Sequence, residues 1–243
     1  MKRALTGIDL TPFSAFTNVE AEAVRTLERA AVIYTLKHRE MLYRQGDIAH
    51  SLYFVRSGGL KLVEHTADGK QVTLKIFGTG DMFGLLAISG PFPQTNSAEA
   101  VDEAVIIGIG STDIREVIRQ YPLFGLRVVD LLVAHVHQAH GRIRTMMVER
   151  VEQRLARALL HYCDKFGTEK DGFISIDVTL SQQDLAQFCG ATLETINRTL
   201  KVWEEQGLLK LSRQHIDITD RLTLQNIVDT HAVAMPYEAN VTR

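Results

Sequence analysis

The hydrophobic pattern divides the chain into a strand-rich first half and a helical second half. Between Val32 and Ile109, short runs of β-branched and aromatic residues alternate with turns that are marked by glycine and aspartate. Runs at such close and regular spacing are typical of short antiparallel strands. They predict a small antiparallel barrel or roll, whose clearest strands are Leu52–Val55, Leu60–Val63, Val72–Phe77 and Ala104–Ile109.

After Pro122 the pattern becomes that of a long helix. Apolar residues recur at alternating spacings of three and four over about three heptads, which is the seam of a two-stranded coiled coil. The seam residues are Val129, Leu132, Val136, Ala139, Ile143 and Met146. We expect this helix to pair two copies of the chain; the alternative is one core-facing helix in a monomer. The seam ends near Glu149, where we place a hinge.

The segment from Ser181 to Gly207 predicts two short helices joined by a tight turn. Ser181 is a good N-cap, and Asp184 stands three residues later, where a capping box places its acid. Gly190 supplies the backbone freedom that the turn needs, and Thr192 can cap the second helix. In this geometry, the helix-turn-helix, the second helix enters a DNA major groove.

The second of these helices has an apolar and a charged face. Its apolar stripe is formed by Ile196, Leu200 and Trp203. From roughly the opposite side project Glu194, Arg198, Lys201 and Glu205. Two strand-like runs follow the helix, at Leu208–Leu211 and His215–Thr219. They predict a β-hairpin that makes the domain winged.

Composition and charge set limits on this interpretation. The 243 residues suit two domains, and 45% hydrophobic with 23% charged residues is ordinary for a soluble globular protein. A net charge of −2 is unusual for a DNA-binding protein, whose footprint is usually basic. Positive charge gathers ahead of the helix pair, at Arg142, Arg144, Arg150, Arg154 and Arg157. Neither a signal peptide nor a membrane-spanning run is visible, which predicts a cytoplasmic protein with no membrane partner.

The sequence offers little for catalysis or metal binding. Its two cysteines, Cys163 and Cys189, stand in apolar helical contexts and are expected to be reduced core thiols. A four-cysteine iron–sulfur cluster is therefore excluded. The chain has no P-loop, nucleophile elbow or HExxH motif, so we expect neither an enzyme nor a metal site. Two non-DNA alternatives stay open: a ligand-binding regulatory module, and a dimeric scaffold that binds protein.

The order of roll, long helix and winged helix-turn-helix resembles the CRP/FNR superfamily of bacterial transcription regulators, over about residues 42–218. The segments that carry this resemblance are Gln45–Asp47, Leu52–Gly58, Gly80–Gly84, Arg154–Leu160, Leu180–Ala186 and Glu194–Arg198. It implies an α+β fold with an antiparallel β-roll like a cyclic-nucleotide-binding domain. It also implies a sensor domain at 1–122, a dimerisation helix at 123–148, a DNA-binding domain at 149–220 and a tail at 221–243. The pattern of the tail predicts a helical stretch ahead of Pro236.

The resemblance further implies how DNA is read. Glu194 and Arg198 match the family's base-reading acid and arginine, which can accept from cytosine N4 and donate to guanine. Leu193 stands where the cyclic-AMP receptors carry a second guanine-reading arginine, so we expect a half-site closer to TTGA than to TGTGA. The alternative for Glu194 and Arg198 is a surface ion pair. The full set of expected DNA contacts is Gln182, Gln183, Thr192, Leu193, Glu194, Thr195, Asn197, Arg198 and Lys201.

The effector pocket departs from the cyclic-AMP-binding subgroup. Where that subgroup has a glutamate for the ribose and an arginine for the phosphate, this chain has Leu85 and Asn96. Losing a charge-assisted contact to a buried phosphate weakens binding, which speaks against cyclic AMP. The lining of Leu85, Leu86, Ile88 and Phe92 favours a less polar effector. The candidate pocket comprises Gly84, Leu85, Leu86, Asn96, Ser97, Ala139 and His140.

Other control mechanisms stay open. Haem is a second hypothesis, since some family members sense gases with it and a neutral imidazole binds iron well. His135, His137 and His140 cluster on the long helix, and His140 adjoins the seam. Activity set by the cellular level of the protein, with no ligand, is a third. The resemblance also implies RNA polymerase as a partner besides double-stranded DNA and a second copy of the chain.

Overall fold

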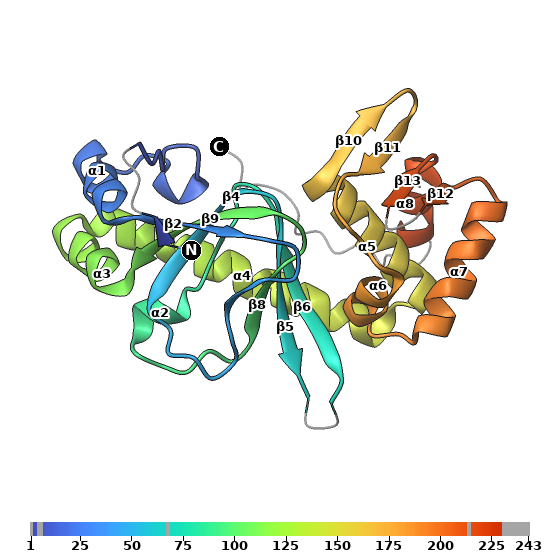
Figure 1. The fold of residues 1–243 in the computed structure, drawn as a ribbon, viewed down its shortest axis with the longest axis horizontal. Coiled ribbons are helices and arrows are strands. Elements are labelled where there is room, and N and C mark those ends of the chain that lie inside the picture. Colours follow the sequence, from blue (N-terminus) through green and yellow to red (C-terminus); the bar gives the residue numbers. More distant parts are fainter. Residues whose placement is uncertain (1, 4–6, 67–68, 213–214, 230–243) are drawn as a thin grey trace.

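The computed structural model describes residues 2–3, 7–66, 69–212 and 215–229. A roll of β-strands with its helices lies at one end of the molecule, and a smaller helical domain lies at the other (Figure 1). The long helix α4 (Pro122–Val148) passes behind both. Among the described residues, no helix is long and apolar enough to cross a membrane.

Two antiparallel sheets form the N-terminal roll, as the strand spacing predicted. One has the order β1 (Lys2–Arg3), β2 (Val32–Leu36), β9 (Ala104–Gly110), β4 (Ser51–Ser57) and β7 (Met82–Phe83). The other has the order β3 (Met41–Tyr43), β8 (Ser97–Ala100), β5 (Leu60–His65) and β6 (Gln71–Phe77).

Opposite faces of the first sheet bury different clusters, because successive side chains of a strand point to opposite sides. Tyr53 points into the roll, where its ring lies 5.2 Å from Phe83 and 5.8 Å from Tyr43. Phe54, the next residue, packs on the outside against the helices. These helices are η1 (Ser14–Phe16), α1 (Ala21–Ala30), α3 (Ser111–Gln120) and the start of α4. The short α2 (Leu86–Ser89) follows Gly84.

The chain leaves the helical conformation where the sequence placed a hinge. Helix α4 ends at Val148, Glu149 and Arg150 have extended backbone, and α5 (Val151–Phe166) begins immediately afterwards. The C-terminal domain adds α6 (Gln182–Cys189) and α7 (Leu193–Glu205). Its four-stranded sheet has the order β10 (Gly167–Lys170), β11 (Phe173–Ile176), β13 (His215–Ile218) and β12 (Leu209–Ser212). The predicted wing is β12–β13; the β10–β11 hairpin was not predicted.

The segment after residue 220 was expected to be a tail with a helical stretch; the structure has the helix but packs it on the C-terminal domain. Helix α8 (Arg221–Asp229) packs against α5, with Leu224 and Val228 buried in the core of the C-terminal domain. These two residues are four apart, so they lie on one face of a helix and can be buried together. The remainder of the predicted tail, residues 230–243, lies outside the described residues.

Candidate nucleic-acid interface

The turn between α6 and α7 is built by local hydrogen bonds. The Ser181 hydroxyl accepts from the Asp184 amide at 3.1 Å, and a carboxylate oxygen of Asp184 accepts from the Ser181 amide at 3.2 Å. This is the predicted capping box. Gly190 takes a left-handed conformation at φ 59°, and Thr192 caps α7 by accepting from the Thr195 amide at 3.2 Å. The two helices are therefore held in the predicted geometry.

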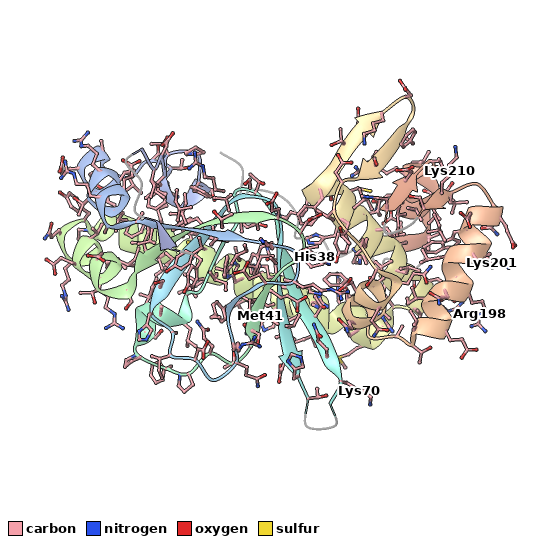
Figure 2. The ribbon with its side chains drawn as sticks, in the orientation of Figure 1. His38, Met41, Lys70, Arg198, Lys201 and Lys210 are labelled. Carbon is pink, nitrogen blue, oxygen red and sulfur yellow. The ribbon has the colours of Figure 1, made fainter. Side chains whose placement is uncertain are left out.

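Helix α7 presents one polar face to solvent. Ile196, Leu200 and Trp203 are buried against the domain. Arg198 and Lys201 are exposed, and Figure 2 shows them at the end of the molecule opposite the roll. Glu194 is exposed as well, and within the described part of the chain no ion pair joins it to Arg198. Both side chains are thus available to a ligand.

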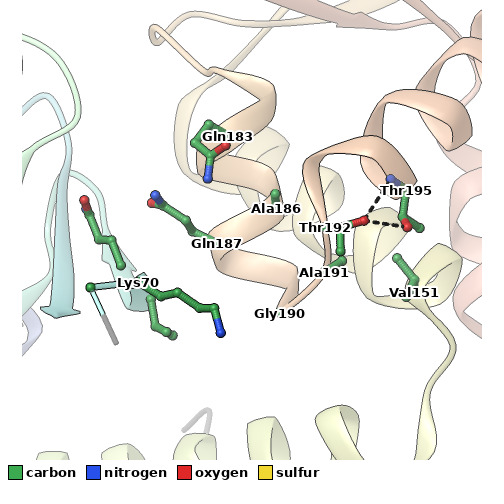
Figure 3. Close-up of a pocket in the computed structure, with 12 residues that line it drawn as sticks. Lys70, Val151, Gln183, Ala186, Gln187, Gly190, Ala191, Thr192 and Thr195 are labelled. Atoms are coloured by element: carbon green, nitrogen blue, oxygen red, sulfur yellow. Dashed lines mark hydrogen bonds between the residues drawn. The ribbon is translucent and has the colours of Figure 1, made fainter. Parts of the chain in front are cut away.

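Most of the other expected DNA contacts are also accessible to solvent. Gln182, Gln183, Thr192, Leu193 and Asn197 are exposed, and Thr195 is half-buried. A pocket lies between the helix pair α6–α7 and the β5–β6 hairpin of the roll (Figure 3). It is lined by Gly69, Lys70, Gln71, Val72, Val151, Gln183, Ala186, Gln187, Gly190, Ala191, Thr192 and Thr195.

Two of the arginines that were expected to gather positive charge bond to backbone carbonyls within the molecule instead. Arg142 donates to the Phe188 carbonyl at 2.9 Å, and Arg154 donates to the Cys189 carbonyl at 2.8 Å. These are terminal carbonyls of α6, which a cation stabilises. Arg157 pairs with Glu149 at 2.6 Å but stays exposed. Tertiary packing thus withdraws the charges of Arg142 and Arg154, but not that of Arg157, from the surface.

The predicted dimer seam is exposed in the single chain. Its large apolar members on α4 are between 37% and 57% exposed: Val129, Leu132, Val136, Ile143 and Met146. Ala139 is exposed too. A continuous apolar stripe of this kind on a long helix is unfavourable in water.

Two family models match the chain on either side of this helix. The model for cyclic nucleotide-binding domains matches residues 34–121, and that for Crp-like helix-turn-helix domains matches residues 153–227. The chain belongs to the CRP/FNR superfamily of transcription regulators. The predicted fold, a cyclic-nucleotide-binding-like roll followed by a long helix and a DNA-binding helix-turn-helix, is thereby confirmed.

Relatives within the superfamily are named for different signals. The chain is 27% identical to a CRP-like cAMP-activated global transcriptional regulator of Mycobacterium tuberculosis, over 84% of this chain and 92% of the relative. It is 24% identical to an anaerobic regulatory protein of Bacillus subtilis, over 79% and 82%. A CRP-family regulator from Thermus thermophilus shares the fold at a TM-score of 0.70, with 24% identity over 80% of this chain and 96% of that one. Membership therefore leaves the effector of this regulator undetermined.

Packing changes the picture of the effector pocket. Leu85 and Ile88 contact the outer helical cluster rather than the interior of the roll, and Phe92 is 51% exposed. None of these three residues belongs to the buried cluster inside the roll. Leu86 is half-buried, and Ala139 and His140 are exposed on α4.

Aromatic rings fill the interior next to the expected site. Gly84 has a φ of +85°, and a Cβ there would lie 2.8 Å from both the Ser51 carbonyl oxygen and the Tyr53 ring. Burial raises the pKa of Tyr53 to about 12. The Ser97 hydroxyl accepts from the Gln45 amide at 2.9 Å, while the buried side-chain oxygen of Asn96 has no hydrogen-bond partner among the described residues. The segment that holds phosphate in the cyclic-AMP-binding subgroup thus has no cationic side chain here.

The histidines of the haem hypothesis do not converge. His137 and His140 are exposed, whereas His135 is half-buried. Burial, and then Lys75, lowers the pKa of His135. No three potential metal ligands cluster among the residues that the structure describes.

Both cysteines are buried free thiols in the C-terminal domain. Burial raises the pKa of Cys163 to about 11 and that of Cys189 to about 12. A thiol that is protonated at neutral pH is a poor nucleophile. This agrees with the predicted packing role.

Proposed function

We propose that the protein is a dimeric transcription regulator that binds a palindromic promoter site through α7. The observation that carries this proposal is the solvent-facing polar surface of that helix, opposite its buried stripe. Glu194 and Arg198 lie one turn apart on this surface and are not paired with each other. Since an acid can accept from cytosine and an arginine can donate to guanine, the pair suits base recognition in the major groove. Such a function places the protein in the cytoplasm, with RNA polymerase as a second partner.

A second copy of the chain is the partner that suits the exposed seam on α4. Apolar residues at alternating spacings of three and four pack against the same residues of an identical helix. The pairing gives a two-fold axis, which matches the two-fold symmetry of a palindromic operator. Dimerisation and DNA recognition therefore support each other in this proposal.

The half-site follows from three residues at the start of α7. Arg198 would donate to a guanine and Glu194 would accept from a cytosine, which suits the G·C pair of a TGA sequence or the base pair beside it. Leu193 is 41% exposed and carries no donor, but its methyl groups can contact the methyl group of thymine. We infer a half-site closer to TTGA than to TGTGA.

The signal is an effector other than cyclic AMP, or the cellular level of the protein itself. Leu85 packs outward and Asn96 lacks a charge, so neither can replace the acid and the arginine of the cyclic-AMP-binding subgroup. The stacked rings beside Gly84 support the same conclusion.

A titration of a labelled TTGA palindrome, followed by fluorescence anisotropy with and without cyclic AMP, tests the proposal. We expect binding that ignores cyclic AMP and weakens steeply with salt, because phosphate contacts release counterions. A duplex with scrambled half-sites is the control. Binding that appears only with cyclic AMP, or a site selection that returns TGTGA palindromes, would contradict the proposal.

A further inference from the structure

The C-terminal domain is packed on the outer face of one sheet of the roll. Ile76 of β6 and Val101, just after β8, belong to the hydrophobic core of the C-terminal domain. Gly59 lies so close to the Phe166 ring that a Cβ there would be 2.6 Å from it. The two domains therefore share a packed interface in addition to the hinge between α4 and α5.

A buried cation lies at this interface. The Lys61 ammonium is 2.6 Å from an oxygen of Asp184 on α6 and 3.1 Å from an oxygen of Glu99 on β8. The side chains of Lys61, Glu99 and Asp184 are 7%, 9% and 15% exposed. Lys61 and Glu99 stand directly opposite each other in the β5–β8 ladder, so the sheet fixes both. Asp184 is the member contributed by the DNA-binding domain.

The same carboxylate also organises the start of α6. Asp184 is the acid of the capping box that holds Ser181, while its other oxygen accepts from Lys61. Burial tends to raise the pKa of Asp184, but Lys61 and Ser181 outweigh it and leave the pKa lowered. Asp184 thus ties the first turn of the helix-turn-helix to the roll as a charged group.

The other end of α6 is held by the dimer helix. Arg142 of α4 donates to the Phe188 carbonyl at 2.9 Å and to the Thr73 carbonyl of β6 at 2.8 Å. Its guanidinium lies 4.1 Å from the centre of the Phe188 ring. Helix α6 is therefore anchored at both ends, and α7 follows it through a turn of three residues.

We propose that Lys61, a residue of the sensor domain, is a positioning residue for DNA recognition. It fixes the orientation of α6, and hence of α7, relative to the dimer helix, so that the two recognition helices are held at one separation. This inference rests on the proposed recognition of a palindrome by α7. A buried ion pair suits this role, because its geometry is strict and removing one partner leaves an uncompensated buried charge. Glu99 lies on β8, which begins immediately after Asn96, and this links the ion pair to the expected effector segment.

The test is the dependence of DNA affinity on half-site spacing in Lys61→Met. If the DNA-binding domain is held rigidly, the dimer binds half-sites at one spacing only. If the domain is loosened, the dimer also binds a palindrome whose half-sites are one base pair further apart. If the correct orientation falls to about a tenth of the population, the affinity for the correct spacing falls about tenfold. The affinity for the longer palindrome should change little, so that spacing discrimination shrinks. A purely structural loss of folded protein would weaken both duplexes equally.

Asp184→Asn is the second variant, because an asparagine keeps an acceptor for Ser181 and removes the charge that Lys61 needs. Arg25→Met is the matched control, since it removes a cation from an exposed ion pair in the same domain. Hydrogen exchange of residues 181–189 in the free dimer measures docking without DNA, and we expect it to quicken in both interface variants. If the wild type bound no palindrome, this exchange would still test the docking while the proposed function failed. Unchanged spacing discrimination and unchanged exchange in Lys61→Met and Asp184→Asn would overturn the inference.

Discussion

The outer face of α7 and the expected effector segment of the roll were both identified from motifs. In the structure, the first is exposed to solvent, whereas the second is covered by other side chains. On α7, Glu194, Arg198 and Lys201 are exposed as the helical period requires. In the roll, Leu85 turns to the outer helices, and Tyr53 covers Gly84. Which side chains a single helix exposes depends only on the helical period of its apolar and polar residues. A pocket, in contrast, depends on which side chains from distant strands fill it.

The largest expected effect concerns the filled interior of the roll. Tyr53→Ala removes a ring that stacks at 5.2 Å on Phe83 and lies 5.8 Å from Tyr43. Truncating a buried aromatic residue costs about 3–5 kcal/mol, so the free energy of unfolding should fall by that order. Urea denaturation measures it. Tyr53→Phe keeps the ring, and we expect a much smaller loss. Equal losses in the two variants would show that the hydroxyl, rather than the ring, stabilises the roll.

Arg198→Ala affects the opposite end of the molecule. It should remove about 1–3 kcal/mol of discrimination between the TTGA palindrome and a duplex altered at the guanine. Anisotropy titrations of both duplexes give this difference, and sedimentation should show an unchanged dimer. Retained preference for the guanine would remove Arg198 from the reading residues.

The interface between the two regions should weaken in mild acid. His161 of α5 stacks on Phe188 of α6 and lies close enough to Ile76 and Asp81 of the roll for both to influence its pKa. Burial, and then Lys165, lowers the pKa of His161 below the usual 6.5, against the opposing effects of Asp81 and Asp164. Below about pH 6.5 the unfolded state therefore binds more protons than the folded state. Stability should therefore be lost as the pH falls from 6.5 towards the lower folded pKa.

Urea midpoints measured between about pH 7.5 and pH 5.5 follow this loss while most carboxylates stay ionised. His161→Gln cannot gain the proton, so its midpoints should depend less on pH. The pKa of the half-buried His135 is lowered too, so some dependence of the urea midpoint on pH should remain in the variant. Identical slopes in wild type and variant would mean that His161 does not titrate between the two states.

The smallest effect is expected for Lys201→Ala on the exposed face of α7. A lysine that contacts phosphate weakens all sequences alike, and its loss should reduce the slope of log affinity against log salt by about one. Titrations at several salt concentrations measure that slope for a specific and a scrambled duplex. If the affinity fell only for the specific duplex, Lys201 would contact bases instead of phosphates.

Much of the fold was predictable because its signals are local. The capping box of Ser181 and Asp184, the turn at Gly190 and the stripe of Ile196, Leu200 and Trp203 act within a few residues of each other. The hinge at Glu149 and the strands β4, β5, β6 and β9 were predicted for the same reason. The family resemblance depended on the order of these local signals.

The β10–β11 hairpin was missed, since it carries little hydrophobic signal. A helical stretch after residue 220 was predicted, but its packing on α5 was not. The fates of Arg142 and Arg154 were misjudged as well. Their guanidinium groups cap carbonyls of α6, which are 46 and 35 residues away in sequence. An arginine that has no obvious partner nearby in the sequence can thus bond to a distant part of the chain in the folded protein.

The sequence by itself determined the architecture, the family and the exposed recognition face, because helical and strand periods and capping residues act over one or two turns. Only the tertiary structure decided where Leu85 points, which rings fill the roll, and that Lys61 reaches an acid 123 residues further along the chain. These contacts depend on how sheets and helices pack. Packing brings together side chains that are far apart in the sequence and show no periodic pattern that would predict their contact.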